Sequence, residues 1–283
     1  MFLDRMSLKK LRNIREANLT LHHKTNVIIG ENAAGKTTLL EAVDILSRGR
    51  SFRTNKTENL VCHGNNSFYV GATLGPDKKK LEIEKSKNRT KISINGKEEK
   101  KQSRLAQELA IQSIHPNSHS LIEGAPSERR AFLDWGLFHV EHEFRKEWSG
   151  YIKILRQRNE ALKSGGGDEK TWMEKLAVSG EIVSSLREKY VLGLEKSIIE
   201  TQKYLMPESE IIFYYEKGWG KDKSFMESLT EKRSLDMDRG YTSSGPQNAD
   251  IKIMLNGKEA QKICSRGQQK LIANIMLLSQ AKD

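Results

Sequence analysis

Cysteine is scarce in this sequence, and long apolar runs are missing from it. Cys62 and Cys264 are the only two cysteines among 283 residues, and no CxxC pair or other metal-binding spacing is present. A disulfide framework or a zinc site is therefore not indicated, and we expect a reduced, cytoplasmic protein. No stretch approaches the ~18 apolar residues of a membrane span. Asp4 interrupts the first apolar residues, so the sequence does not begin like a secretory signal.

Acidic residues are fewer than basic ones. The chain has 48 Lys and Arg against 37 Asp and Glu, a net charge of +11. Such an excess favours a polyanionic partner, either nucleic acid or an anionic surface. A solvated basic surface would give the same count, so the charge alone makes a nucleic acid plausible and no more. At 283 residues the chain is long enough for two core-forming units.

The strongest motif lies near the N-terminus. Residues 30–37, GENAAGKT, satisfy the GxxxxGK[ST] pattern of a P-loop. The apolar run Val27, Ile28 and Ile29 precedes the motif, and Leu39, Leu40, Val43 and Leu46 follow it at helical spacing. We therefore predict a phosphate-binding loop between a buried strand and an amphipathic helix.

The residue types in this motif suit the phosphates of a nucleotide. Gly30 and Gly35 let the backbone turn its N–H groups inward, toward phosphate oxygens at the helix N-terminus. Lys36 can reach the β and γ phosphates, and the Thr37 hydroxyl can ligate Mg²⁺. A plain glycine turn would explain the glycines but not Lys36 together with Thr37. The predicted ATP-binding residues are Gly30, Glu31, Asn32, Ala33, Ala34, Gly35, Lys36 and Thr37.

Around the P-loop the pattern is mainly β. We expect two short strands within residues 2–21, around Arg12 and Asn13, a basic loop at residues 49–54, and a meander of strands at 68–74, 81–85 and 91–94. A short helix near Leu105, Ala106 and Leu109 and a strand at 111–114 follow. A domain boundary is expected near His115 and Pro116.

The next segment is predominantly helical. Ser127 is a good N-cap, and apolar and aromatic residues recur at helical spacing from 144 to 162 and from 172 to 205. The glycine-rich linker 164–168 separates these two stretches, so we predict an antiparallel helical hairpin. We expect a strand at 211–215, a helix at 225–235, a strand at 251–255, and a last helix with Leu271, Ile272, Ile275 and Leu278 on one face.

Six blocks, in order, carry a resemblance to a known family. They read GENAAGKTTLLEAV, GRSFRT, LIEGAPSERRAFLDWGLFHVE, LRQRNEAL, GPQNAD and SRGQQKL and span residues 30–271. In these blocks the sequence resembles the RecF family of bacterial DNA replication and repair proteins, which belongs with the SMC proteins among ABC-type ATPases. The resemblance implies an α/β ATPase head, with a mixed sheet and an antiparallel meander, interrupted by a helical arm. The head would comprise residues 1–115 and 241–283, and the arm residues 116–240.

The resemblance also implies a mechanism. ATP would be held by the P-loop of one subunit and capped by the signature motif of another, here Ser265, Arg266, Gly267 and Gln268. Nucleotide would therefore control homodimerisation. Family members bind single-stranded and gapped DNA, help load recombinase, and support the SOS response together with other recombination mediators. Two alternatives stay open: an ABC-type ATPase subunit of another system such as a transporter, and a truncated product that does not fold stably.

Two departures from the family pattern matter. The chain ends at Asp283, before the family's apolar strand that ends in Asp and is followed by a catalytic Glu. We therefore expect an incomplete sheet, little ATP hydrolysis and no catalytic residue, because Mg²⁺ and water lose their carboxylates. The sequence Phe132, Leu133, Asp134 imitates that strand but lies in the arm. The family's GPHRxD motif reads GPQNAD here, with Gln247 and Asn248 in place of His and Arg.

Three smaller groups have more than one interpretation. His139, Glu141 and His142 lie close together, but their spacing favours surface or packing roles over a metal site. Arg129 and Arg130 suit either phosphate contact or pairing with acids inside the arm. Arg12 resembles the family's arginine near the nucleotide base, although an edge-strand arginine would look the same.

Overall fold

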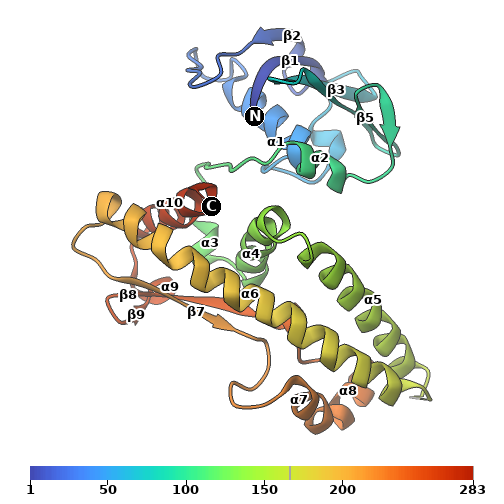
Figure 1. Cartoon of the computed structure of the whole chain (residues 1–283). Coiled ribbons are helices and arrows are strands. Elements are labelled where there is room, and N and C mark those ends of the chain that lie inside the picture. Colours follow the sequence, from blue (N-terminus) through green and yellow to red (C-terminus); the bar gives the residue numbers. More distant parts are fainter. Residues whose placement is uncertain (166, 283) are drawn as a thin grey trace. The chain divides into compact units, whose positions relative to one another are not determined.

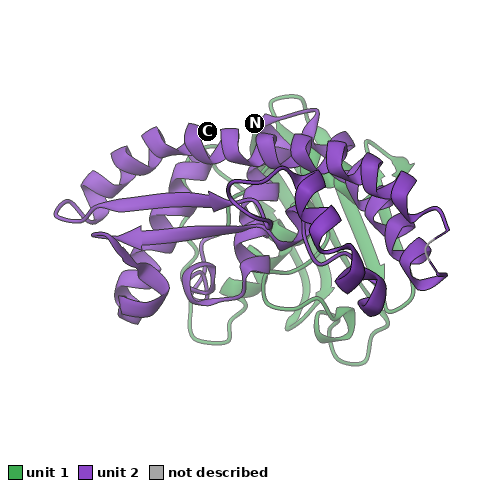
Figure 2. Cartoon of the chain, turned by 90° about the horizontal axis from the view of Figure 1, so that it is seen from below, with its two compact units in different colours: residues 1–113 green, residues 114–283 purple. Residues whose placement is uncertain are grey.

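The computed structural model describes residues 1–165 and 167–282. The chain divides into two compact units, residues 1–113 and 114–283 (Figure 2). The division lies two residues before the boundary expected at 115. Residues 241–283 fall in the same unit as the helical segment, and their assignment to an ATPase head stays a prediction. No helix among the described residues is both long and apolar enough to cross a membrane.

Unit 1 is an antiparallel sheet with helices packed on one face (Figure 1). Its strand order is β2-β1-β3-β4-β5-β6. The strands are β1 (Phe2–Leu11), β2 (Ile14–Thr20), β3 (Ser67–Gly75), β4 (Lys79–Ser86), β5 (Thr90–Ile94) and β6 (Lys97–Glu99). The helices are α1 (Lys36–Arg48), the 3-10 turn η1 (Thr57–Asn59) and α2 (Ser103–Glu108). The predicted meander is thereby confirmed, and β6 is an addition to it.

Alternation of side chains along the strands builds the core of unit 1. Leu8, Val70, Ile83 and other inward residues are fully buried against Ile45 and Leu46 of α1. The neighbouring side chains on each strand point to the opposite face. The predicted strand at 111–114 is wrong, because these residues form neither strand nor helix.

Unit 2 is built around a long helical hairpin and a small sheet of order β7-β8-β9. The helices are α3 (Ser120–Glu123), α4 (Pro126–Val140), α5 (Phe144–Lys163), α6 (Glu169–Leu205), α7 (Phe225–Glu231), α8 (Arg233–Arg239), α9 (Ala260–Ile263) and α10 (Arg266–Lys282), with the 3-10 turn η2 (Pro246–Asn248). The strands are β7 (Ile211–Glu216), β8 (Asp250–Leu255) and β9 (Lys258–Glu259).

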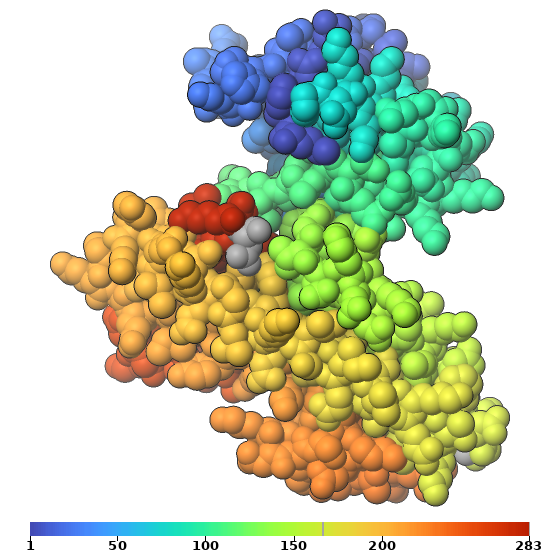
Figure 3. All heavy atoms as spheres, in the orientation of Figure 1, coloured from blue at the N-terminus to red at the C-terminus, as the bar shows by residue number. Residues whose placement is uncertain are grey.

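The helical periodicity predicted this hairpin, and the structure confirms it. Helices α5 and α6 pack along their length and bury Tyr151, Leu155 and Leu176 between them. The predicted linker 164–168 includes residue 166, which lies outside the described residues. One side of α6 reaches the surface, where it appears as yellow and gold spheres in Figure 3. Leu192 and Tyr204 of α6 are 65% and 86% exposed.

Two of the predicted helices differ from the structure. Helix α4 begins at Pro126 with Ala125 as N-cap, so Ser127 lies inside the helix. Proline fits the first helical position because its missing N–H would have no partner there. The helix expected at 225–235 is two helices, α7 and α8, divided at Lys232. Helix α7 opens with a capping box between Ser224 and Glu227.

Candidate nucleotide-binding site

The predicted P-loop leads directly into α1. Residues 30–35 form an irregular loop, and α1 begins at Lys36. Gly35, the N-cap, has φ 100°, and a Cβ added there would lie 3.2 Å from Ile14 Cγ1. Glycine therefore fits this position for both its backbone freedom and the space it leaves.

The strand predicted before the loop is wrong for this structure. Residues 26–30 pair with no strand of the described sheets, and Val27 and Ile29 are 77% and 89% exposed. Leu40, predicted on the buried face of α1, is 53% exposed. An apolar run becomes a strand only when another strand pairs with it. Among the described residues, no strand pairs with residues 26–30.

The N-terminus of α1 is open to an anion. No side chain caps it, and its first turn carries no acidic residue. The uncapped N–H groups and the positive end of the helix dipole suit phosphate oxygens. Lys36 Nζ donates to the carbonyl oxygens of Gly30 and Glu31, each at 2.7 Å. The ammonium is therefore held over the loop, and Thr37 beside it is exposed. These features fit a triphosphate, with the Thr37 hydroxyl available to Mg²⁺.

Asn13 fastens the loop to the sheet. Its Nδ2 donates to the Ala33 carbonyl at 2.7 Å, and its Oδ1 accepts from Thr38 Oγ1 at 3.0 Å. One side chain in the β1–β2 turn thus contacts both the P-loop and the first turn of α1. The sequence placed Asn13 in a turn but gave no sign of these partners, because they lie 20 and 25 residues away.

Glu41 of α1 contacts Arg12, Ser51 and Arg53. Its side chain is fully buried and forms a bidentate ion pair with Arg12, with Oε1–Nη2 at 2.7 Å and Oε2–Nε at 2.6 Å. Ser51 Oγ donates to Oε1 at 2.5 Å, and Arg53 Nη1 lies 3.6 Å from Oε2. Arg12 therefore pairs with a buried carboxylate, which an edge-strand arginine in solvent would not do. Its relation to a nucleotide base stays a prediction.

The predicted signature motif opens α10. Ser265 precedes the helix, and Arg266, Gly267 and Gln268 form its first turn; all four are exposed or partly exposed. The Ser265 N–H donates to Gln268 Oε1 at 2.9 Å, and the Gln268 N–H donates to Ser265 Oγ at 3.3 Å. This is a capping box, which the S-x-x-Q spacing alone would have predicted. Because the hydroxyl only accepts in this box, its O–H remains available to a phosphate oxygen.

The buried face of α10 differs from the one predicted. Ile272 and Ile275 are fully buried, as expected, but Leu271 and Leu278 are 37% and 39% exposed. Ala273 and Met276 complete the buried face in their place. The predicted helix is confirmed. Which of its neighbouring apolar residues are buried is decided by packing within unit 2, and the sequence pattern does not reveal that packing.

The GPQNAD block, residues 245–250, contacts the two arginines of SERR, residues 127–130 of the third block. Arg129, only 5% exposed, forms a bidentate pair with Asp250, with Nε–Oδ1 at 2.7 Å and Nη2–Oδ2 at 2.9 Å. Arg130 donates to the Ala249 carbonyl at 2.8 Å, and burial lowers its pKa. Of the two interpretations for Arg129, pairing with an acid is the one observed. Gln247 accepts from Tyr151 and Asn248 donates to the Ser243 carbonyl.

Two further arginines fix the arm from inside. Arg187 pairs with Asp134 in a bidentate contact at 2.9 and 3.0 Å. Burial raises the pKa of Asp134, and Arg187 opposes that rise. Arg158 is fully buried. Its Nη2 donates to Glu169 Oε1 at 2.8 Å, and its Nη1 donates to Asp236 Oδ2 at 2.8 Å. Arg158, within the LRQRNEAL block, therefore joins α5 to α6 and α8, and Arg187 joins α6 to α4. Among residues 1–165 and 167–282, no group of three or more His, Cys, Asp and Glu could hold a metal ion.

Comparisons with known proteins agree with this architecture. The model for the "RecF/RecN/SMC N terminal domain" matches residues 2–282. The DNA replication and repair protein RecF of Chromohalobacter salexigens is 33% identical over 99% of this chain and 79% of its own length. That of Psychromonas ingrahamii is 37% identical over 99% and 80%.

Solved structures of RecF and of an Smc head domain also resemble this chain. "Structure of the recombination mediator protein RecF-ATP in RecFOR pathway" superposes with a TM-score of 0.91 at 27% identity, over 99% of this chain and 80% of that one. The Pyrococcus furiosus Smc head domain, bound to a domain of ScpA, matches with a TM-score of 0.59 at 13% identity, over 99% and 79%, which shows the ATPase-head fold alone. On these matches the chain belongs to the RecF/RecN/SMC family and, within it, to the RecF proteins of DNA replication and repair.

Proposed function

We propose that this chain is an ATP-binding factor of recombinational DNA repair and replication restart. The observation that carries the proposal is the open N-terminus of α1, with Lys36 held over it by two loop carbonyls. A triphosphate would replace those carbonyls as the acceptor for Lys36, and Mg²⁺ would add the Thr37 hydroxyl as a ligand. A solved structure similar to this chain is that of RecF-ATP, which supports ATP as the nucleotide.

The proposal extends to assembly and to DNA. Two copies would enclose ATP, with the Ser265 hydroxyl of one copy donating to the γ phosphate held by the other. The dimer would bind single-stranded or gapped DNA in the cytoplasm, act with other recombination mediators to load recombinase, and support the SOS response. The net charge of +11 supports a polyanionic partner. That residues 1–283 hydrolyse little ATP stays a prediction.

The first test replaces the P-loop lysine. Lys36→Ala removes charge-assisted hydrogen bonds to phosphate, so we expect ATP affinity to fall on the order of 100-fold. Isothermal titration calorimetry with ATP and Mg²⁺ measures the change. Lys24→Ala, at an exposed lysine before the loop, serves as the matched control and should bind like the wild type. Unchanged affinity in Lys36→Ala would refute the P-loop assignment.

The second test separates ATP binding from dimerisation. Ser265→Arg places a bulky cation at the start of α10, where the second subunit would have to approach. We expect monomers to bind ATP normally and ATP-dependent dimers to disappear, as measured by light scattering. Ser234→Arg, at an exposed helical serine in α8, should leave dimers intact. Normal dimers in Ser265→Arg would defeat the sandwich arrangement.

A further inference from the structure

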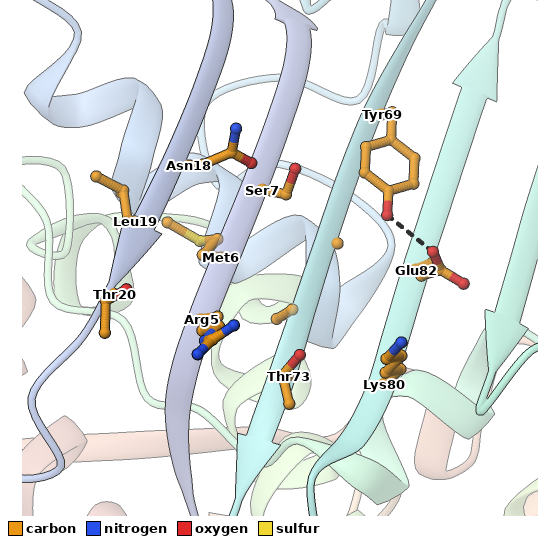
Figure 4. A pocket seen from close by; sticks show the side chains of 12 residues that line it. Arg5, Met6, Ser7, Asn18, Leu19, Thr20, Tyr69, Thr73, Lys80 and Glu82 are labelled. Atoms are coloured by element: carbon orange, nitrogen blue, oxygen red, sulfur yellow. Dashed lines mark hydrogen bonds between the residues drawn. The ribbon is translucent and has the colours of Figure 1, made fainter.

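The face of the unit 1 sheet opposite α1 carries a hollow of about 460 Å³ (Figure 4). Its lining comes from adjacent strands, so strand register places these side chains in rows across the sheet. The lining residues are Arg5, Met6, Ser7, Asn18, Leu19, Thr20, Tyr69, Gly71, Ala72, Thr73, Lys80 and Glu82. Most are polar, and none belongs to the candidate nucleotide site.

One row across this hollow holds two cations, Arg5 and Lys80. Arg5 is in register with Thr73, and Thr73 with Lys80; Figure 4 shows the three in line across β1, β3 and β4. Neighbouring strands lie ~4.8 Å apart, so the two cationic residues are roughly 10 Å apart with a hydroxyl between them. Within residues 1–165 and 167–282, no ion pair includes the side chain of Arg5 or Lys80. A phosphate over Thr73 would therefore have a cation on each side.

In the row farther along the sheet, each lysine lies across from a glutamate. Lys9 pairs with Glu16 across β1 and β2 at 3.3 Å, and Lys91 is in register with Glu84. Glu82, within the hollow, accepts a hydrogen bond from Tyr69. The charged residues that line the hollow are therefore Arg5, Lys80 and Glu82, which together carry a net charge of +1, with both cations in the Arg5 and Lys80 row.

Beside that row lies a flat aromatic ring. Tyr69 Oη donates to Glu82 Oε1 at 2.8 Å, and Figure 4 shows the ring face-on over the strands. A Cβ added at Gly71 would lie 2.3 Å from Tyr69 Oη, so glycine is what lets the ring lie across β3. Burial and Glu82 raise the pKa of Tyr69 to about 12. The phenol thus stays protonated at neutral pH and holds its bond to Glu82.

We propose that this sheet face binds single-stranded DNA, with a base stacked on Tyr69 and its phosphate held by Arg5, Thr73 and Lys80. Stacking platforms beside cations bind single strands because unpaired bases expose their faces, which a duplex does not. Gly71, under the ring, and Thr73 are two residues apart on β3, roughly 7 Å, a span within one nucleotide. The inference rests on the proposed function only in taking DNA as the partner, and it needs neither ATP nor a dimer.

The test measures binding of a fluorescein-labelled oligo-dT by anisotropy, without nucleotide, so that ATP-dependent dimers do not contribute. Tyr69→Ala should weaken binding roughly tenfold or more, because the base then has no ring to stack on. The double variant Arg5→Ala/Lys80→Ala should weaken it and lower the slope of log affinity against log salt by about 0.7 for each phosphate that the protein no longer neutralises. Tyr214→Ala and Lys87→Ala/Arg89→Ala, at residues that do not line this hollow, are the matched controls and should bind like the wild type.

Tyr69→Phe distinguishes stacking from loss of fold, because it keeps the ring and removes only the hydroxyl. It should bind oligo-dT within about twofold of the wild type, with an unchanged circular dichroism spectrum. Unaltered binding in folded Tyr69→Ala, equal loss in the controls, or a preference for duplex would each overturn the inference. ATP-dependent binding of gapped DNA, measured on the same variants, reports on the proposed function separately. It can survive when oligo-dT binding without nucleotide fails.

Discussion

At the scale of single residues, Glu41 is the group on which the surroundings of the P-loop depend most. It is fully buried and receives Arg12, Ser51 and Arg53, three side chains from separate segments. Removing one partner of a buried ion pair leaves the other charge uncompensated. We expect Glu41→Gln to lower the free energy of unfolding of unit 1 by about 2 kcal/mol, below the fully buried range because Arg12 and Arg53 keep solvent contact. Urea denaturation measures the change.

The control for Glu41 is a glutamate of the same unit that is not fully buried. Glu84→Gln, on β4, should change the free energy of unfolding by less than about 0.5 kcal/mol. If Glu41→Gln is as stable as Glu84→Gln, the ion pairs at Glu41 contribute nothing, and the account of this cluster is wrong.

The sequence could identify residues of the P-loop but not the residues that support them. Lys36 and Thr37 belong to a local motif, whereas Asn13 and Glu41 are recognised only through partners distant in sequence. The same holds for Arg129, whose partner Asp250 lies 121 residues away. Sequence patterns left that arginine between two interpretations, because ion pairing is decided by tertiary structure.

At the scale of elements, local periodicity predicted the helices well and the isolated apolar run poorly. Helices α5 and α6 satisfy their backbone hydrogen bonds internally, so their pattern is sufficient to identify them. Residues 27–29 carry an equally clear apolar pattern, yet a strand requires a neighbour that no local pattern can supply. For the same reason the irregular segment at 111–114 was predicted as a strand.

Helices α4, α6 and α10 approach each other closely at Gly136. A Cβ added at Gly136 of α4 would lie 1.8 Å from Tyr190 Oη of α6 and 2.5 Å from Gln280 Nε2 of α10. Those two side chains are themselves hydrogen-bonded at 3.1 Å. Gly136→Ala should therefore push the helices apart and destabilise unit 2 by about 1–3 kcal/mol, measured by urea denaturation.

Gly193 provides the matched substitution. It lies within α6, and a Cβ added there meets nothing within 4 Å. Gly193→Ala should stabilise the helix by roughly 0.5–1 kcal/mol, because alanine restricts the unfolded chain without a clash. Equal effects of the two alanines would show that the approach at Gly136 is not tight.

At the scale of the whole molecule, each unit buries a hydrophobic core of its own. A unit with its own core can unfold as its own cooperative step. We therefore expect two transitions in differential scanning calorimetry. ATP with Mg²⁺, at about 100 times its dissociation constant, should stabilise the transition of unit 1 by about 2.7 kcal/mol, because the P-loop lies in that unit. The transition of unit 2 should not move in monomers.

Two variants assign the transitions. Lys36→Ala, with its affinity lowered on the order of 100-fold, should reduce the shift caused by ATP from about 2.7 to about 0.4 kcal/mol without changing the number of transitions. Arg158→Ala leaves Asp236 buried without its cation, while Glu169 keeps only its ion pair with Arg233, so it should lower the transition of unit 2 alone, by about 3–5 kcal/mol. A single transition that both ATP and Arg158→Ala move would mean that the two cores unfold as one. In that case nucleotide binding in unit 1 would stabilise the helical hairpin directly, and the two units would have to be treated as one folding domain.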